Sequence, residues 1–267
     1  MAASQPGVQL SVSGKVALIT GGSRGIGAAT VKMFCAAGAK VVFNYQKAQS
    51  AAAAVVAECG TSCCAAVQAE LSSAREAEQL VNAAVARFGR IDCLVANHGI
   101  WPPHDAPIDQ MTEEQWRQTI AINLDSVFGL VKHCVAQMKR QGRPNIGGAA
   151  GRIVIISSTA GQRGEAFHCD YAASKGAVIS MVKGLSTELA RDGIYVNCVA
   201  PGWVATDMAA PALADSKTRE RVFATIPLGR VGRADEIAAP VLFLCTEHAG
   251  FITGEILNVN GGAVLVG

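Results

Sequence analysis

Short apolar runs alternate with longer segments of helical composition along most of the chain. Seven runs are brief, rich in apolar and β-branched residues and bounded by glycine or polar residues, which is typical of strands. They lie at 15–20, 41–43, 64–69, 91–96, 152–157, 195–199 and 256–259.

The segments between these runs predict helices. The first of these helices ends near 37, and the others span 48–58, 72–88, 112–140, 171–191 and 235–245. Ser72 is the predicted N-terminal cap of the helix at 72–88, and Gly38 and Gly89 are predicted to end the helices before them. Strands and helices thus alternate at the pace of βαβ units. The pattern predicts an α/β fold, a single-domain, Rossmann-like, doubly wound parallel sheet of about seven strands with helices on both faces.

Two stretches depart from this alternation. Residues 1–14 are small and polar, so we expect a flexible N-terminal tail before one dinucleotide-binding domain at 15–267. Residues 203–226 look irregular and follow a strand, where long insertions are usually functional. We therefore expect a substrate lid at 203–226.

Composition excludes several classes of protein. The 267 residues are 50% hydrophobic and 16% charged with a net charge of +2, so we expect neither nucleic acid nor a membrane as a partner. No basic region precedes an N-terminal apolar run, and no apolar run approaches the roughly 20 residues that span a bilayer. The nine cysteines lack metal-ligand spacing, so we expect reduced thiols, a cytoplasmic location and no metal site.

A glycine-rich turn follows the first predicted strand and opens a helix. Gly21, Gly25 and Gly27 lie in it, although not in the common G-x-G-x-x-G spacing. Glycines here permit a tight turn and a close approach of the backbone to a pyrophosphate on the helix N-terminus. Asn97 and Gly99 follow the fourth strand, where such sheets bind ligands. The sequence predicts a dinucleotide site, with an ordinary βα turn as the alternative.

A hydroxyl, a phenol and an ammonium are predicted to converge after the fifth strand. Ser158 follows that strand, and Tyr171 and Lys175 are four residues apart, on one face of a helix. Together they can protonate a carbonyl oxygen while a hydride reaches the carbon. Lowering the phenol pKa from about 10 to about 7 takes roughly 4 kcal/mol, which we expect the Lys175 cation to supply. An ordinary amphipathic helix is the alternative.

These motifs resemble those of the short-chain dehydrogenase/reductase family, and the resemblance runs from Lys15 to the end of the chain. The family's nicotinamide segment is matched by Pro201-Gly202 with Thr206, and its C-terminal signature by 258–262. The residues that the resemblance places at the cofactor are Gly21, Ser23, Arg24, Gly25, Ile26, Gly27, Asn44, Tyr45, Glu70, Leu71, Asn97, Gly99, Tyr171, Lys175, Pro201, Gly202, Val204 and Thr206.

The resemblance also implies catalytic roles and an assembly. In it Ser158 positions the carbonyl oxygen, Tyr171 donates the proton, Lys175 lowers the phenol pKa and holds the ribose, and Asn123 completes a proton path through water. It implies a homotetramer with the helices at 112–140 and 171–191 in the interfaces.

Two positions depart from the family pattern. The family's Asn-Asn-Ala-Gly motif is Ala96-Asn97-His98-Gly99 here, so His98 brings a polar ring to a position usually held by alanine. Glu70 stands where the family usually has an aspartate near the adenine amino group.

Residues 42–47 indicate the choice of cofactor. An NAD-selective fold places a carboxylate near the end of the second strand, and this stretch has none. A 2′-phosphate would meet no repulsion there and could meet Arg24 and Lys47. We therefore predict NADP(H) as the cofactor.

The resemblance is closest to the β-ketoacyl-acyl-carrier-protein reductases, on segments 227–230, 235–238 and 252–255. It implies an oxidoreductase that acts on CH–OH groups and reduces a ketone or aldehyde, with a 3-oxoacyl thioester as the first candidate. The alternatives are an NAD(P)-dependent dehydrogenase of a sugar, polyol or steroid alcohol, and a dinucleotide-sensing regulator without turnover.

Several side chains are expected to shape the substrate pocket beside Ser158, and they are Trp101, His104, Phe167, His168 and Trp203. An acidic carrier protein would further require a basic patch at the mouth of the site. The candidates for that patch are Lys139, Arg140 and Arg143, with solvated surface charge as the alternative.

Overall fold

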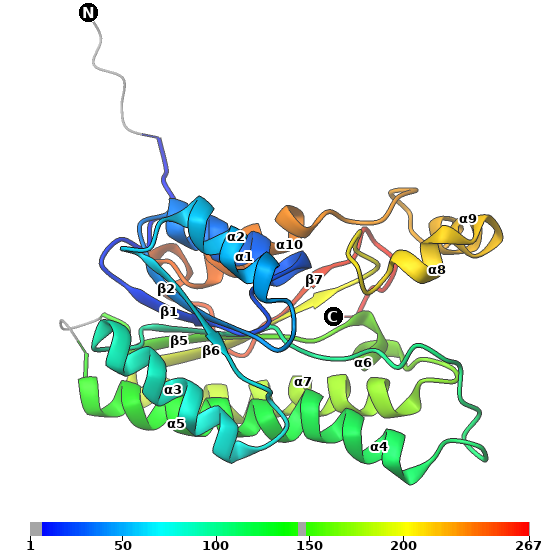
Figure 1. Ribbon diagram of the computed structural model, residues 1–267, viewed down its shortest axis with the longest axis horizontal. Coiled ribbons are helices and arrows are strands. Elements are labelled where there is room, and N and C mark those ends of the chain that lie inside the picture. The colour runs from blue at the N-terminus through cyan, green and yellow to red at the C-terminus, as the bar shows by residue number, and fades with distance from the viewer. Residues whose placement is uncertain (1–6, 144–147, 267) are drawn as a thin grey trace, which may run out of the picture.

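The computed structural model describes residues 7–143 and 148–266 and is built around one parallel sheet (Figure 1). The seven strands have the order β3-β2-β1-β4-β5-β6-β7, and every neighbouring pair is parallel. They are β1 Val16–Ile19, β2 Lys40–Tyr45, β3 Cys64–Gln68, β4 Cys93–Ala96, β5 Gly151–Ile156, β6 Ile194–Pro201 and β7 Ile256–Val259. The predicted doubly wound α/β fold is confirmed, with its switch point between β1 and β4.

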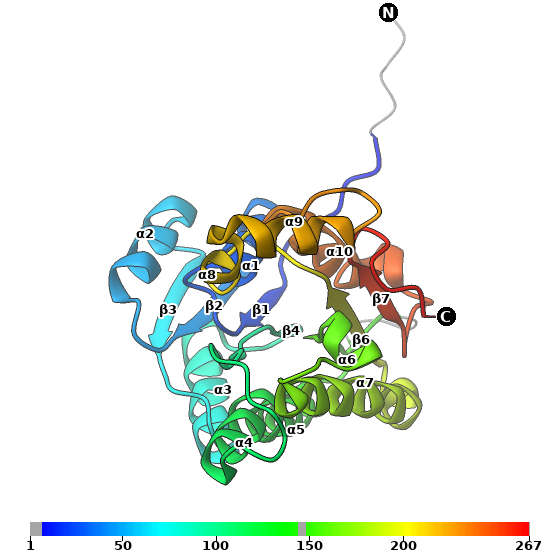
Figure 2. The same cartoon turned by 90° about the vertical axis from the view of Figure 1, so that its right-hand side faces the viewer.

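Helices cover both faces of the sheet (Figure 2). One face carries α1 Gly25–Ala36, α2 Gln49–Cys59 and α10 Ala234–Leu244, and the other carries α3 Ala74–Phe88, α5 Ser126–Gln141 and α7 Cys169–Leu189. Successive strand residues point to opposite faces, so Leu18 enters one apolar core and Ile19 the other. Both side chains are fully buried, as expected for a sheet without a solvent face.

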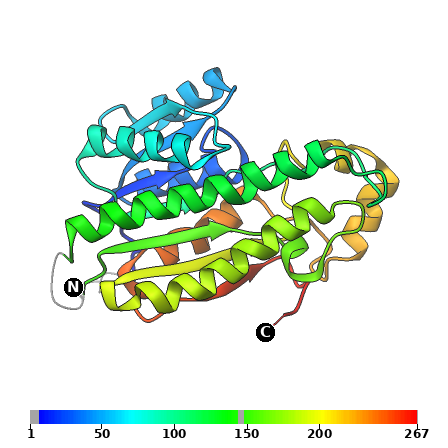
Figure 3. The same cartoon turned by 90° about the horizontal axis from the view of Figure 1, so that it is seen from below.

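The helix predicted at 112–140 has an interruption. It consists of α4 Glu113–Ile120, a π-helical turn at Ala121–Asp125 and α5, and it crosses one face of the sheet beside α7 (Figure 3). Among the described residues this run, Glu113–Gln141, is the one helix long and apolar enough to cross a membrane by those two criteria. Leu130 and Met138 are buried in the core, which explains its apolar composition without a bilayer.

Two predicted details at the ends of elements are wrong. Val12 is only 2% exposed and its N–H donates to the carbonyl of Ala37 at 3.0 Å, so the expected tail is attached by this residue. Residues 1–6 of that tail, like 144–147, lie outside the described residues. The cap of α3 is Ser73, whose hydroxyl accepts from Glu76 N, while Ser72 donates to the Glu76 carboxylate.

The segment at 203–226 is more regular than predicted. It forms α8 Ala210–Ala214 and α9 Ser216–Ala224, and Val204 makes a β-bridge to Gly232. Pro211 lies in the first turn of α8, where its missing N–H costs nothing, and Asp215 caps α9 by accepting from Thr218 N at 2.8 Å. The remaining short helices are α6 Thr159–Arg163 and 3₁₀ turns at Ala190–Asp192 and Glu247–Ala249.

Candidate active site

A cleft of about 460 Å³ opens at the carboxyl edge of the sheet. In Figure 2 this edge faces the viewer, with α6, α8 and α9 around it. Every residue predicted at the cofactor lines this cleft, and so do Ser158, Trp101 and Trp203. The tertiary structure therefore brings together residues that range from Gly21 to Ala212 in the sequence.

The glycine loop forms one end of the cleft and fits a pyrophosphate. Gly25 has φ 53°, which favours glycine, and a Cβ on Gly27 would lie 2.1 Å from the carbonyl oxygen of Gly21. Arg24 is the N-cap of α1 and its side chain makes no capping hydrogen bond. The first-turn N–H groups of α1 are thus directed at the cleft with no side-chain acceptor from the cap, as an anion site requires.

The side-chain amides of Asn44 and Asn97 hold this loop in place. Asn44 accepts from Gly21 N and donates to Ala69 O, both at 2.9 Å. Asn97 donates from its side chain to Thr20 O at 2.9 Å and from its backbone to the Thr20 hydroxyl at 2.9 Å. The polar atoms of these amides tie the ends of β1, β2 and β4 together, so both residues shape the cofactor wall.

His98 links the same region to α5. Its Nδ1 lies 2.8 Å from the Thr20 hydroxyl and its Nε2 2.7 Å from the Ser126 hydroxyl, which itself donates to Ile122 O. Nε2 must therefore donate to Ser126, and in a neutral ring Nδ1 then accepts from the Thr20 hydroxyl. Burial, and then the Lys175 charge, lower the pKa of His98 to about 3, in agreement with a neutral ring.

The predicted catalytic groups meet in the middle of the cleft. Ser158 caps α6 by accepting from Ala160 N at 3.1 Å, and its hydroxyl lies close enough to the Tyr171 phenol to lower the phenol pKa. Tyr171 lies in the first turn of α7 and is 8% exposed. Lys175, one turn later, donates from Nζ to Ile156 O at 2.9 Å.

The expected lowering of the phenol pKa by Lys175 is wrong for this structure. Burial raises the pKa of Tyr171 to about 12, and the opposing hydrogen bond from Ser158 does not cancel it. The ammonium lies 5.8 Å from the centre of the phenol ring and donates to a backbone carbonyl. Burial also lowers the pKa of Lys175 itself to about 8. Desolvation therefore dominates both groups.

Asn123 supports the site from outside the cleft lining. It is fully buried in the π-helical turn, accepts from Ile100 N at 2.8 Å and donates to Ile100 O at 3.0 Å. Its amide also donates to Ser174 Oγ at 3.2 Å. Both Asn123 Oδ1 and Lys175 Nζ would touch a Cβ on Gly99, so the two groups flank the same glycine.

Aromatic rings form a wall beside the phenol. Trp101 meets Tyr171 edge-on at 4.6 Å between centroids and stacks on His168 at 4.1 Å. His168 is 4% exposed, binds Pro102 O at 3.0 Å through Nε2 and lies outside the cleft lining. The prediction that His168 contacts substrate is wrong, because the ring lies behind Trp101. His104 and Phe167 also lie outside the lining.

Several residues at the site escaped the sequence prediction. Arg163 and Glu165 line the cleft as an ion pair of 2.6 Å, and Asp207 lines it while paired with Arg24 at 3.0 Å. Asp170 is fully buried and accepts from Tyr171 N at 2.8 Å and Thr119 Oγ1 at 2.9 Å, which attaches α4 to the start of α7. In the sequence, Arg163, Glu165 and Asp170 lie between Ser158 and Tyr171. Their position between two predicted catalytic residues is the feature of the sequence that could have identified them.

The predicted basic patch is in the wrong place. Lys139 and Arg140 belong to the end of α5, which precedes β5 and so lies at the amino edge of the sheet, opposite the cleft (Figure 1). Lys139 is paired with Asp192 at 2.6 Å, and Arg143 donates to Arg191 O. These charges therefore do not flank the mouth.

The fold and the cleft define a class of protein. A glycine loop lies at the switch point of a doubly wound sheet and faces a serine, a tyrosine and a lysine. This arrangement is typical of a dinucleotide-dependent oxidoreductase. A family sequence model described as enoyl-(acyl carrier protein) reductase matches residues 21–264. The chain belongs to the short-chain dehydrogenase/reductase family and is an oxidoreductase.

Three known proteins are similar to this chain over nearly its full length. A 3-oxoacyl-[acyl-carrier-protein] reductase of Synechocystis is 40% identical over 96% of this chain and 99% of its own length. An acetoacetyl-CoA reductase of Rhizobium meliloti is 38% identical over 93% of this chain and 98% of its own. The crystal structure of a Brucella melitensis 3-ketoacyl-(acyl-carrier-protein) reductase complexed with NADH has a TM-score of 0.86, with 31% identity over 96% of this chain and 100% of that one.

Proposed function

We propose that this chain is an NADPH-dependent reductase of 3-oxoacyl thioesters. The observation that carries the proposal is the convergence of Ser158, Tyr171 and Lys175 in the cleft that the glycine loop opens. Relatives named for 3-oxoacyl-carrier-protein and acetoacetyl-CoA reduction support the substrate class. Both substrates carry a ketone at the β-carbon of an acyl thioester.

The residues of the cleft fit reduction of a ketone. Bound NADPH supplies the hydride, and this chain supplies the proton and the geometry. With a pKa of about 12, the Tyr171 phenol is protonated at neutral pH, which is the form that donates a proton. The Ser158 hydroxyl lines the same cleft and would be a second donor to the carbonyl oxygen.

The wall near the end of β2 supports NADPH over NADH. The cleft there is lined by Asn44, Tyr45, Gln46 and Lys47, with no carboxylate among them. Arg24 stands in the glycine loop, and its present partner Asp207 is a surface carboxylate. An exposed pair contributes about 0–1 kcal/mol, so a phosphate that offers a charge-assisted hydrogen bond of about 1.5–3 kcal/mol is the better partner.

The substrate half of the cleft is apolar on one side. Trp101 and Trp203 line it with Met208, which fits an acyl chain. We infer that 203–226 closes over this half, that four copies assemble, and that the enzyme works in the cytoplasm, where its thiols stay reduced.

The test is NADPH oxidation against a panel of acetoacetyl-CoA, an acetoacetyl carrier protein, simple ketones, sugars and a steroid ketone. We expect the highest kcat/KM for the thioesters. Faster NADP⁺-dependent oxidation of a sugar, polyol or steroid alcohol would replace the thioester assignment. Tight NADPH binding without turnover of any member would instead indicate the regulator.

A further inference from the structure

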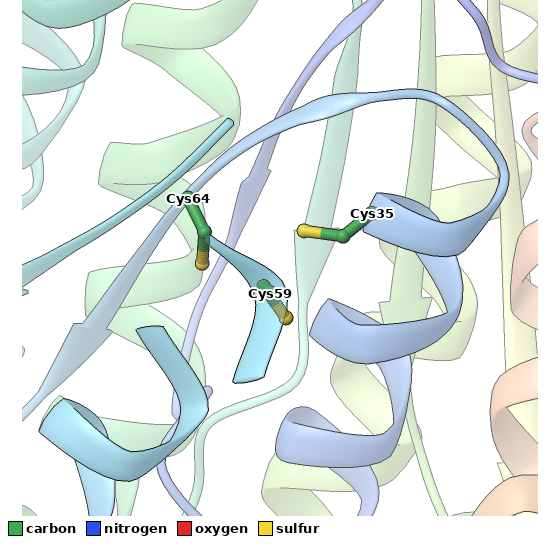
Figure 4. A group of neighbouring side chains, drawn as sticks. All are labelled: Cys35, Cys59 and Cys64. Carbon is green, nitrogen blue, oxygen red and sulfur yellow. The ribbon is translucent and has the colours of Figure 1, made fainter. Parts of the chain in front are cut away.

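Three cysteines from three separate elements meet on the face of the sheet that carries α1 and α2 (Figure 4). Cys35 lies in the last turn of α1, Cys59 ends α2 and Cys64 begins β3. Their sulfur atoms all lie within 4.8 Å of one another, and among the described residues no other three such ligand side chains come this close. The sequence hides this group, because Cys35 is far from the other two along the chain.

The spacing of the sulfurs suits a thiophilic cation. Zn²⁺ binds thiolate sulfur at about 2.3 Å in a tetrahedron, which places sulfurs about 3.8 Å apart. The three thiols are therefore within about 1 Å of closing on one ion. Figure 4 shows the Cys35 side chain directed toward the gap between Cys59 and Cys64.

The backbone around the thiols favours positive charge. Both α1 and α2 end at this cluster, and helix C-termini carry partial negative charge. Neither helix has a basic residue in its last turn to neutralise that charge. Cys63 precedes Cys64 in the sequence and its thiol donates to Cys59 O at 3.0 Å, so a fourth thiol lies near the group.

The cluster is also open to entry from solvent. Cys35 and Cys59 are partly exposed, while Cys64 is buried. An incoming cation takes each ligand as a thiolate, and the displaced protons go to water.

We propose that Cys35, Cys59 and Cys64 form a binding site for one thiophilic cation of the Zn²⁺ type, with Cys63 or water as the fourth ligand. The site would join the C-terminal ends of α1 and α2 to the start of β3. Cys35 lies ten residues after Gly25, about 15 Å along α1. The ion would therefore stabilise the helix that bears the glycine loop without touching the reacting atoms.

The experiment uses the full-length chain, reduced and freed of metal, with Zn²⁺ for affinity and Cd²⁺ as a spectroscopic probe. We expect one Zn²⁺ per chain, a rise in Tm, and an ultraviolet thiolate-to-Cd²⁺ charge-transfer band that Mg²⁺ does not produce. Absence of that band in the unaltered chain would overturn the proposal without any variant.

Variants then locate the site. We expect Cys35→Ala and Cys59→Ala each to weaken Zn²⁺ binding at least about tenfold and to reduce the Cd²⁺ band. The matched control is Cys169→Ala, which removes another partly exposed thiol, near Met111, and should change neither reading. Equal Zn²⁺ affinity in all four proteins would place the ion elsewhere and overturn the assignment. So would a native disulfide between two of the three cysteines, seen by mass spectrometry before reduction, if the reduced chain binds no Zn²⁺.

Discussion

At the scale of single residues, burial moves the two ionisable groups of the active site in opposite directions. It raises the pKa of Tyr171 to about 12 and lowers that of Lys175 to about 8, because it disfavours the charged form of each. At neutral pH the phenol is thus protonated and most of the lysine is charged. The chain holds a proton donor ready beside a cation that is costly to bury.

Replacing Tyr171 by Phe should remove the proton donor and leave the ring. Positioned proton transfer contributes about 10²–10⁴-fold, so kcat should fall by that factor while the NADPH Kd changes little. Steady-state kinetics and NADPH fluorescence would measure the two quantities. The control is Tyr195→Phe in β6, whose ring packs on Arg152. A kcat within about threefold of the unaltered enzyme would rule out the phenol as the donor.

Lys175 should cost stability that depends on pH. Burial lowers its pKa from the usual 10.5 to about 8. This difference corresponds to a free-energy preference of about 3 kcal/mol for the neutral form in the folded protein. The folded pKa is the lower one, so the unfolded chain binds more protons between about pH 8 and 10.5 and stability rises across that window.

Lys175→Met should therefore abolish turnover yet unfold at higher urea than the unaltered chain at pH 7. The difference should shrink as the pH rises from 8 toward 10.5. Exposed Lys183 in the same helix provides the control, Lys183→Met, which should show no such trend. A Lys175→Met variant that is less stable at pH 7 would mean that the bond to Ile156 O outweighs desolvation.

Arg24 should set the preference for NADPH. Arg24→Ala should lose roughly 10–100-fold in kcat/KM with NADPH and keep its rate with NADH, since one charge-assisted bond contributes about 1.5–3 kcal/mol. Because Asp207 competes for the same guanidinium, Asp207→Asn should bind NADPH more tightly. Equal efficiency of the unaltered enzyme with both cofactors would contradict the assignment.

At the scale of elements, helices and strands followed from local pattern, while their details depended on contacts. The alternation of short apolar runs and helical segments predicted all seven strands. The π-helical turn was not predictable from local pattern, because hydrogen bonds from Asn123 to Ile100, in the loop after β4, hold Asn123 in place. Helices α8 and α9 were missed because each is short and α8 contains a proline.

The segment 203–226 should move on binding. It is anchored by buried Val222 and Ile226, while Met208 at the cleft is 53% exposed. Such a segment can fold over the cleft and gain contacts only when cofactor and substrate are present. Hydrogen exchange should show slower exchange of 203–226 with NADP⁺ and product, and unchanged exchange in the middle of α5. Strong and equal protection with and without ligand would count against a lid.

At the scale of the whole molecule, the α4–α5 run leaves two large apolar side chains exposed, Trp116 and Phe128. Phe128 is 52% exposed and Trp116 is 40% exposed. If this side forms an interface of the tetramer, Phe128→Lys should give smaller assemblies in native mass spectrometry, with the fold retained. Val8→Lys, at a residue that is 84% exposed on the other end of the chain, is the control. A monomeric unaltered chain would refute the tetramer.

The sequence by itself determined the sheet, the family and many of the residues that line the cleft. Apolar runs favour burial and glycine-rich segments favour tight turns, and both preferences can be read from neighbouring residues along the chain. Tyr171 and Lys175 could be paired because a helix places residues four apart on one face.

Only the tertiary structure decided the environments of these residues. The pKa of Tyr171 depends on how much protein surrounds the phenol, and the position of the His98 ring depends on the hydroxyls of Thr20 and Ser126. The edge of the sheet at which the predicted basic residues lie was likewise decided by the fold. The thiols of Cys35, Cys59 and Cys64 meet because β2 and β3 are adjacent and both helices end on the same side. Desolvation and proximity arise from the packing of distant segments, and no local pattern contains them.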